Sequence, residues 1–162
     1  MISSSDIFGW FIGSPQVSTQ GAPRNSLPVA DGFPGYISIP QIGVTSLVRD
    51  GTEYVDIDPA HLVESRTPNQ PGNVAIFGHR TSHGHEFKNI DKLGENSLVY
   101  LTIGKKMYTY RVTDLDIRLP TDPLLYASTS NDQTLSLVAC HPPHSVKYRI
   151  VAHAVLIDIV EY

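Results

Sequence analysis

Hydrophobic residues along this chain fall into short runs, several of which alternate apolar with polar positions. The run from Leu135 to Cys140 is an example, because it alternates in part, contains a β-branched residue and stops just before Pro142. Runs of this kind indicate β-strands, and turn signals such as Asp50-Gly51 separate them. The pattern predicts strands over residues 36–39, 44–49, 74–78, 98–103, 107–112, 115–119, 134–140 and 148–159.

Helical signal is sparse by comparison. Residues 58–63 suit one helical turn, since Asp58 is a favourable N-cap and Pro59 can occupy the first helical position. Residues 87–93 have apolar side chains at helical spacing, and Gly94 follows them as a stop signal. Eight strands with two short helices predict an all-β fold, a closed or nearly closed β-barrel.

The first part of the chain has a different composition. Proline and glycine recur through residues 13–35, which indicates a linker or wrapping arm over residues 1–35 and a barrel over residues 36–162. Trp10 and Phe11 are candidate anchors by which such an arm could dock. No stretch approaches the ~18 apolar residues that span a bilayer, so we expect any membrane anchor to lie outside this chain.

Composition narrows the class of protein further. The chain has 162 residues, enough for one domain with a substantial core. Its single cysteine excludes an intrachain disulfide. The formal net charge is −4, and no basic cluster is longer than Lys105-Lys106, so nucleic acid is not an expected partner.

Three residues near the ends of expected strands carry candidate chemistry. Cys140 ends one strand, His79 follows Gly78 at the end of another, and Arg149 lies nine positions after Cys140. A thiol, an imidazole and a guanidinium supply the nucleophile, the proton partner and the oxyanion donor that covalent acyl transfer requires. The sequence therefore predicts a cysteine acyl-transfer site.

Other interpretations of the polar residues compete with this one. A lone cysteine at a strand end is often a small buried hydrophobic residue, and a strand arginine often points to solvent. His79, His83 and His85 together with the thiol could supply zinc ligands, but they lie in a polar, glycine-containing loop, and we expect no metal. Asp114 and Asp116 share a strand face and are expected to be solvated rather than catalytic.

The segments around these candidate residues resemble those of sortases. They are residues 72–81, residues 107–112, and the strand that ends in Cys140-His141-Pro142 with Arg149 after it. Within the family the chain is most similar to class E of high-GC Gram-positive bacteria, and the resemblance runs from about residue 36 to the end.

The resemblance implies a closed eight-stranded β-barrel and a cysteine transpeptidase that needs no cofactor. It implies that Cys140 is the nucleophile, His79 the general acid and base, and Arg149 the group that steadies substrate and oxyanion. The substrate would be a protein with a C-terminal sorting signal of Leu-Ala-x-Thr-Gly or Leu-Pro-x-Thr-Gly type, cleaved between Thr and Gly. The acyl group would pass to an amine of peptidoglycan or of a pilin-like subunit, at the outer face of the plasma membrane or in the cell wall.

Four further residues are expected to bind substrate. Ser136 and Ala139 stand where the family usually has the two threonines of Thr-Leu-x-Thr-Cys, so the hydroxyl just before the nucleophile is absent here. His141 and His144 are expected to line the mouth of the groove.

The sequence shows no evident carboxylate partner for His79. We therefore expect the thiol and the imidazole to titrate almost independently, so that on the order of 1% of molecules hold thiolate and imidazolium together at pH 7. A cysteine hydrolase that releases its product to water would use the same residues, whereas a non-catalytic β-barrel binding module would tolerate loss of Cys140. An L,D-transpeptidase fits less well, because its signature places Gly and Arg close around the cysteine.

Overall fold

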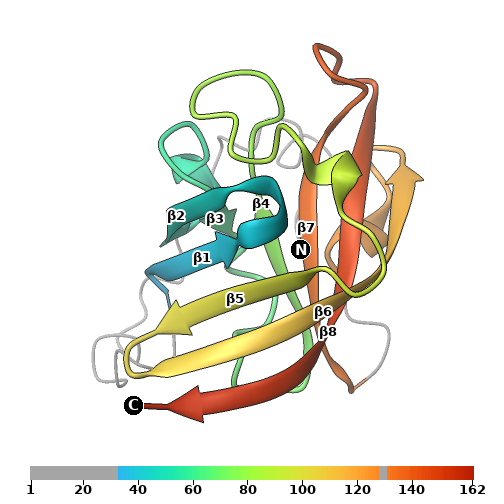
Figure 1. Cartoon of the computed structure of the whole chain (residues 1–162). Helices are drawn as coiled ribbons and strands as arrows, with labels where there is room; N and C mark the ends of the chain where they lie inside the picture. The colour runs from blue at the N-terminus through green and yellow to red at the C-terminus, as the bar shows by residue number, and fades with distance from the viewer. Residues whose placement is uncertain (1–32, 128–130) are drawn as a thin grey trace.

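The computed structural model describes residues 33–127 and 131–162, whose eight strands close into one barrel (Figure 1). The strands are β1 (Gly35–Ile39), β2 (Val44–Asp50), β3 (Ala60–His61), β4 (Gly72–Phe77), β5 (Leu98–Ile103), β6 (Lys106–Arg118), β7 (Gln133–His141) and β8 (Tyr148–Glu161). They follow the order β1-β2-β3-β4-β7-β8-β6-β5, and β5 pairs with β1 to close the barrel. The predicted closed eight-stranded β-barrel is confirmed.

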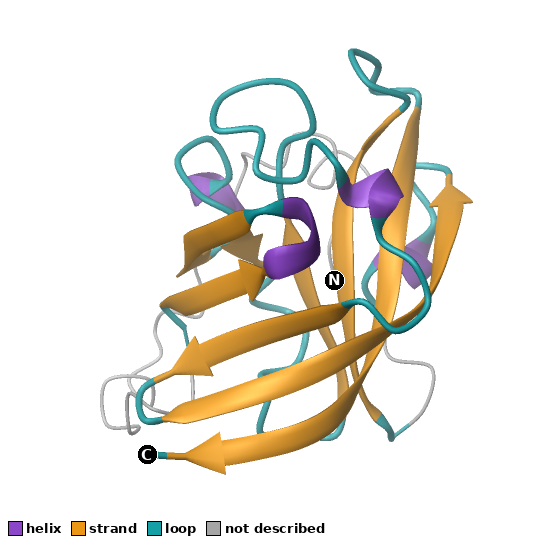
Figure 2. Cartoon of the chain, in the orientation of Figure 1, coloured by secondary structure: helices purple, strands orange, loops and turns teal. Residues whose placement is uncertain are grey.

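The only helices in the described residues are four 3-10 turns (Figure 2), which are η2 (Pro40–Ile42), η3 (Thr52–Tyr54), η4 (Ile90–Lys92) and η5 (Pro123–Leu125). The helix predicted over residues 87–93 shortens to η4. The helix predicted over residues 58–63 is wrong, because Ala60 and His61 form β3, which pairs with β2 on one side and β4 on the other. Backbone pairing on both sides outweighs a local capping signal.

Strand β6 is longer than the pattern predicts, because it joins the runs at residues 107–112 and 115–119. Its register against β8 shifts between Thr109 and Tyr110 and again between Val112 and Asp114. A bulge inserts an extra residue and moves the inward-outward alternation, so the sequence pattern breaks while the backbone pairing continues. Strand β3 therefore supplies the eighth strand in place of the second half of β6.

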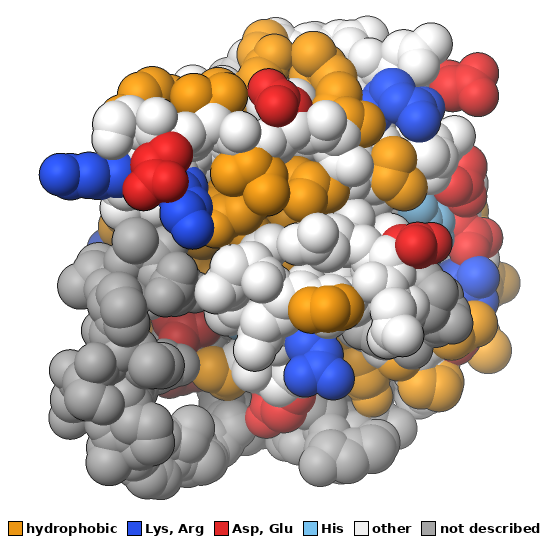
Figure 3. Space-filling model, turned by 90° about the horizontal axis from the view of Figure 1, so that it is seen from below, with side chains coloured by type: hydrophobic (Ala, Val, Ile, Leu, Met, Phe, Trp, Pro, Cys, Tyr) orange, Lys and Arg blue, Asp and Glu red, His pale blue; other side chains and the backbone are white. Residues whose placement is uncertain are grey.

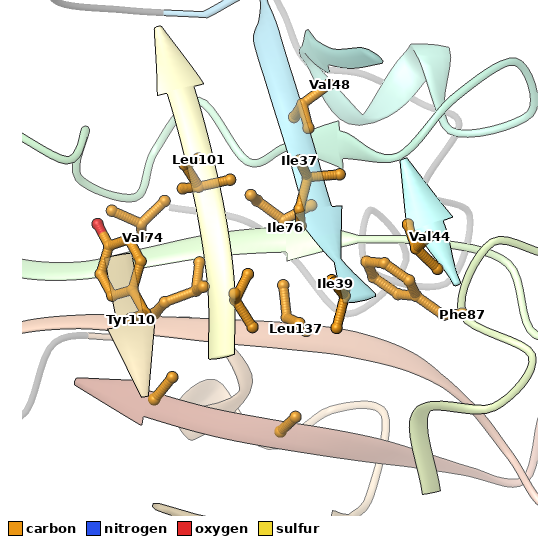
Figure 4. Packing of buried hydrophobic residues seen from close by; sticks show 14 of the residues in the cluster. Ile37, Ile39, Val44, Val48, Val74, Ile76, Phe87, Leu101, Tyr110 and Leu137 are labelled. Carbon is orange, nitrogen blue, oxygen red and sulfur yellow. The ribbon is translucent and has the colours of Figure 1, made fainter. Parts of the chain in front are cut away.

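Inward-facing side chains fill the barrel. In Figure 4, Ile37, Ile76, Leu101 and Leu137 lie together although they come from β1, β4, β5 and β7. Each is fully buried, and burial of an aliphatic side chain of this size contributes about 1.5–3 kcal/mol. This core holds β4 and β7 side by side, which fixes the strand ends where the candidate catalytic residues lie.

A second apolar cluster covers the outer face of β4, β7 and β8. Phe77, Val138 and Val151 alternate with interior residues and pack there together with Leu62 from the loop after β3. Cys140 packs partly buried against the same cluster. The nucleophile candidate therefore lies on the outer face of the barrel wall, at the margin of an apolar patch.

The beginning of the barrel lies slightly before the expected boundary at residue 36. Phe33 packs in the interior core, and its ring stacks on His61 with 4.4 Å between the centroids.

The candidate anchors Trp10 and Phe11 lie outside the described residues. Among the described residues there is no helix with the length and hydrophobicity needed to cross a membrane. Figure 3 shows basic and acidic side chains interspersed on the face seen from below.

Candidate active site

The ends of β4 and β7 bring His79 and Cys140 to one edge of the barrel. These strands are parallel neighbours with Phe77 opposite Val138, and the Gly78 N–H continues the pairing with a 3.0 Å hydrogen bond to the Val138 carbonyl. Parallel strands end on the same side of a sheet, so this register brings the backbone of His79 level with that of Cys140. In Figure 1 the loop after β4 and the β7–β8 connection both lie at the upper end of the barrel.

Arg149 lies directly opposite Cys140 in the antiparallel pair of β7 and β8. Side chains at opposed positions project to the same face, with their Cβ atoms about 4.5–5.5 Å apart. Arg149 is only 1% exposed, and its Nη1 donates hydrogen bonds of 3.0 Å to the carbonyls of Val146 and Tyr148. The β7–β8 hairpin thus holds a buried guanidinium next to the thiol.

Burial raises the pKa of the Cys140 thiol above its ordinary value, because removal from water disfavours the thiolate. The positive charges of Arg149 and Arg80 oppose this effect without cancelling it. Burial lowers the pKa of Arg149 in turn, although a guanidinium remains charged in a protein. At neutral pH the resting site therefore holds mostly a neutral thiol.

This raised pKa predicts slow alkylation of Cys140 by iodoacetamide at and below neutral pH. The midpoint of the rate against pH should lie above that of a free cysteine, about 8.5, because only the thiolate reacts. Mass spectrometry of the labelled protein between about pH 5 and pH 10, beside a small-thiol control, measures it. Labelling at about pH 5 that clearly exceeds the control would contradict the prediction and show a stable thiolate–imidazolium pair.

His79 has a carboxylate partner that the sequence does not reveal, so the expectation of none is wrong. Its Nε2 lies 2.6 Å from Asp56 Oδ1, and its Nδ1 lies 3.2 Å from the Ser82 hydroxyl. Asp56 comes from the turn after η3, and its side chain is 52% exposed. The pair orients the imidazole from the solvent side.

Arg80 is a second buried guanidinium at the site, and its position in a polar stretch of sequence does not indicate this role. It is 3% exposed, and its Nε donates to the Lys88 carbonyl at 2.9 Å. Its Nη1 donates to the Cys140 carbonyl at 3.1 Å and lies 3.2 Å from His141 Nδ1, while Nη2 pairs with Asp91 at 3.1 Å. Arg80 therefore ties the loop after β4 to the end of β7.

Gly78 shows why this loop leaves β4 where it does. A Cβ at Gly78 would lie 2.7 Å from the ring of Phe87, which is fully buried in the interior core. Only glycine lets the backbone pass so close to that ring. The Phe87 ring thus sets the position from which His79 projects.

Of the four expected substrate-binding residues, Ala139 and Ser136 lie away from the Cys140 side chain. Ala139 is fully buried in the interior core, on the opposite face of β7 from Cys140, so its side chain does not face the nucleophile. Ser136 shares the Cys140 face but lies roughly 13 Å along the strand, where it accepts a 3.0 Å hydrogen bond from Asn73 Nδ2 and borders a cavity of about 210 Å³.

The two histidines after the nucleophile remain near it. His141 ends β7 and lies against Arg80. Burial and the neighbouring Arg80 charge lower the pKa of His141, so its ring is neutral at pH 7. His144 is exposed in the β7–β8 connection with a φ of 67°.

The two carboxylates on β6 and the histidines considered as zinc ligands also have partners. Asp114 is exposed and accepts a 2.8 Å hydrogen bond from Thr113, whereas Asp116 is partly buried and pairs with Arg118 at 2.6 Å. Of the histidines weighed as zinc ligands, His79 and His83 do come together, with ring centroids 4.6 Å apart.

Comparison with known proteins gives a family match over most of the chain. The model of the Sortase domain matches residues 37–157. Sortase A of Streptococcus agalactiae serotype III (strain NEM316) is 24% identical over 152 residues, which cover 90% of this chain and 60% of that protein. The chain thus spans about 60% of the length of this curated relative.

Solved sortase structures share the fold. Sortase C-3 from Streptococcus pneumoniae superimposes with a TM-score of 0.82 at 23% identity, covering 99% of this chain and 76% of that one. Sortase A from Corynebacterium diphtheriae gives 0.74 at 22% identity, covering 89% and 73%. The T196V mutant of sortase E from Streptomyces avermitilis gives 0.71 at 26% identity, covering 83% and 93%.

Proposed function

The chain belongs to the sortase family, and we propose that it is a cysteine transpeptidase in which Cys140 is the nucleophile, His79 the general acid and base, and Arg149 the oxyanion donor. One observation carries this proposal. Cys140 faces a buried arginine across β7 and β8, and the parallel end of β4 delivers a histidine to the same edge. A purely structural cysteine needs neither neighbour.

In the first half-reaction the Cys140 thiolate attacks the carbonyl carbon of the Thr–Gly bond in the sorting signal. A carbon–sulfur bond forms, and Arg149 donates hydrogen bonds to the oxygen that becomes negative. The carbon–nitrogen bond then breaks as the His79 imidazolium gives its proton to the departing glycine amine. The acyl group remains on Cys140 as a thioester.

In the second half-reaction an amine attacks the thioester carbonyl. His79 takes a proton from the amine, the carbon–sulfur bond breaks, and a new amide bond joins the two partners. Water in place of the amine would give hydrolysis through the same residues. The proposed acceptor is an amine of peptidoglycan or of a pilin-like subunit, and the proposed location is the surface of a Gram-positive cell.

The proposed sorting signal is Leu-Ala-x-Thr-Gly or Leu-Pro-x-Thr-Gly. The sequence similarity to a sortase E supports a class E enzyme and with it the alanine form. His141 is proposed to line the entrance to the substrate groove, because it directly follows Cys140 and its ring is neutral at pH 7. His144 lies in the exposed β7–β8 connection and is proposed to line the same entrance.

The test is mass spectrometry of the protein incubated with each of the two peptides, with and without an added amine. A transpeptidase gives an acyl adduct on Cys140 and, with the amine, a ligated product. Product that gains only water in both conditions would identify a cysteine hydrolase. Absence of both adduct and product with every peptide would contradict the proposal and favour a binding module.

Arg149→Lys is expected to lower turnover by about 10²–10³, the usual effect of removing one oxyanion donor. Lysine keeps the charge but replaces a planar, five-donor fork that the Val146 and Tyr148 carbonyls hold in place. The kcat and KM for a sorting-signal peptide measure it, with Arg111→Lys on β6 as a matched control. A turnover close to that of wild type would show that Arg149 contributes only its charge.

A further inference from the structure

Three ligand atoms converge beside the candidate active site, from two loops that are distant in sequence. His79 and His83 come from the loop after β4, and Asp56 comes from the turn after η3. Asp56 Oδ1 lies 2.6 Å from His79 Nε2 and 3.4 Å from His83 Nε2. The ligand atoms of all three residues lie within 4.8 Å of one another.

This spacing suits a tetrahedral cation. Zinc bonds of about 2.0–2.1 Å to nitrogen and oxygen place neighbouring ligand atoms about 3.3 Å apart, and the distances of 2.6 and 3.4 Å lie on either side of that value. Seating the ion requires the Asp56–His79 contact to open from 2.6 Å to about 3.3 Å, and the half-exposed Asp56 side chain has room for that rotation. A fourth position remains for water.

The surroundings of His79 also suit a metal. A zinc-bound imidazole usually has its other ring nitrogen hydrogen-bonded, which fixes the tautomer. The Ser82 hydroxyl lies 3.2 Å from His79 Nδ1, so the Nε2 lone pair can face Asp56 and the ion. Asp56 and His83 are 52% and 45% exposed, which leaves a path from solvent.

The ligand set selects the class of cation. Two imidazoles with one carboxylate suit zinc and related transition metals, whereas calcium and magnesium prefer oxygen ligands alone. We propose that Asp56, His79 and His83 form a Zn²⁺ site and that Zn²⁺ bound there reversibly inhibits the enzyme. The inhibition rests on the proposed role of His79, because zinc and a proton compete for the imidazole, and a metal-bound ring cannot be the imidazolium that protonates the leaving amine.

The first experiment separates this site from the thiol. Thiolate is a strong zinc ligand, so Zn²⁺ is titrated by calorimetry into the full chain carrying Cys140→Ala. The expected result is one Zn²⁺ per chain. Loss of binding in this variant would place the metal on Cys140 and overturn the proposal.

The second experiment uses matched histidine variants in the Cys140→Ala background. His83 and His85 lie in the same loop, and both have a positive φ, of 53° and 39°, which asparagine tolerates. His83→Asn should weaken Zn²⁺ binding at least about tenfold, since loss of an outer partner alone costs about 10–100-fold, and Asp56→Ala should do the same. His85→Asn should bind like its parent; equal affinities for the His83 and His85 variants would overturn the site.

Imidazole NMR signals provide a readout that needs no loop variant. Added Zn²⁺ should shift the ring protons of His79 and His83 and leave those of His85 and His144 unchanged. The reverse pattern would overturn the assignment of ligands.

Inhibition is tested in the wild-type enzyme. Peptide cleavage should fall over the same Zn²⁺ range and return with a chelator, while His83→Asn needs at least about tenfold more Zn²⁺ for half-inhibition. Binding without inhibition would leave the metal site standing and refute the proposed role of His79.

Discussion

Cys140→Ala is expected to reduce cleavage of sorting-signal peptides to background, the largest effect of any single substitution proposed for this chain. The sulfur atom forms the acyl bond, and no other thiol exists in the sequence to replace it. Because the side chain is only partly buried against the outer cluster, the change in the free energy of unfolding should stay on the order of 1 kcal/mol.

Two measurements check this prediction together. A discontinuous assay of peptide cleavage gives the activity, and thermal unfolding followed by circular dichroism shows whether the barrel persists. Ile157→Ala is the control, since Ile157 is exposed on β8, away from the strand end that carries Arg149, and should leave both quantities unchanged. Cleavage by Cys140→Ala above background, in protein free of wild type, would refute the nucleophile assignment.

The strands could be predicted from the sequence wherever one barrel face is apolar and the other is not. Residues 98–103 alternate in burial along β5, and the predicted range matches the strand. Strand β3 could not be predicted, because a two-residue strand has no period and is defined only by its partners β2 and β4. In β6 the pattern predicted two strands where the structure has one, because the bulges break the alternation without ending the pairing.

The candidate site shows the same division. Cys140, His79 and Arg149 could be proposed from the sequence because each lies near the end of a strand whose neighbours are recognisable. Asp56 could not, because it meets His79 across 23 positions of chain through a turn without periodicity. Arg80 stands in the same motif as His79, yet a cation in a polar loop is ordinarily solvated, and only the folded chain places it against the Cys140 carbonyl.

The expectation that Ala139 binds substrate conflicts with strand geometry. Adjacent residues of a strand point to opposite faces, so the residue before an outward-facing Cys140 must face the interior. Its complete burial follows from that parity. A threonine at this position would face the interior core in this fold, since the parity depends on backbone pairing and not on the side chain.

His79→Ala is expected to slow acylation by about 10²–10⁴, because the leaving glycine amine then lacks a proton donor. Alkylation of Cys140 by iodoacetamide should persist, since it needs the thiolate and no acid. Asp56→Asn should cost much less than His79→Ala, because Asp56 is half exposed and acts on the reaction only through its 2.6 Å contact with His79 Nε2.

The leaving group distinguishes an acid from a merely structural histidine. An activated ester of the same sorting signal releases a phenolate that departs without protonation, so its acylation should lose far less rate in His79→Ala than that of the amide peptide. Single-turnover acylation of Cys140, followed by mass spectrometry with both substrates, gives the comparison. If His79→Ala slows ester and amide equally, His79 positions the thiol or the strand end and does not donate the proton. Selective loss of the amide reaction assigns that proton transfer to His79, because only the step in which the carbon–nitrogen bond breaks differs between the two substrates.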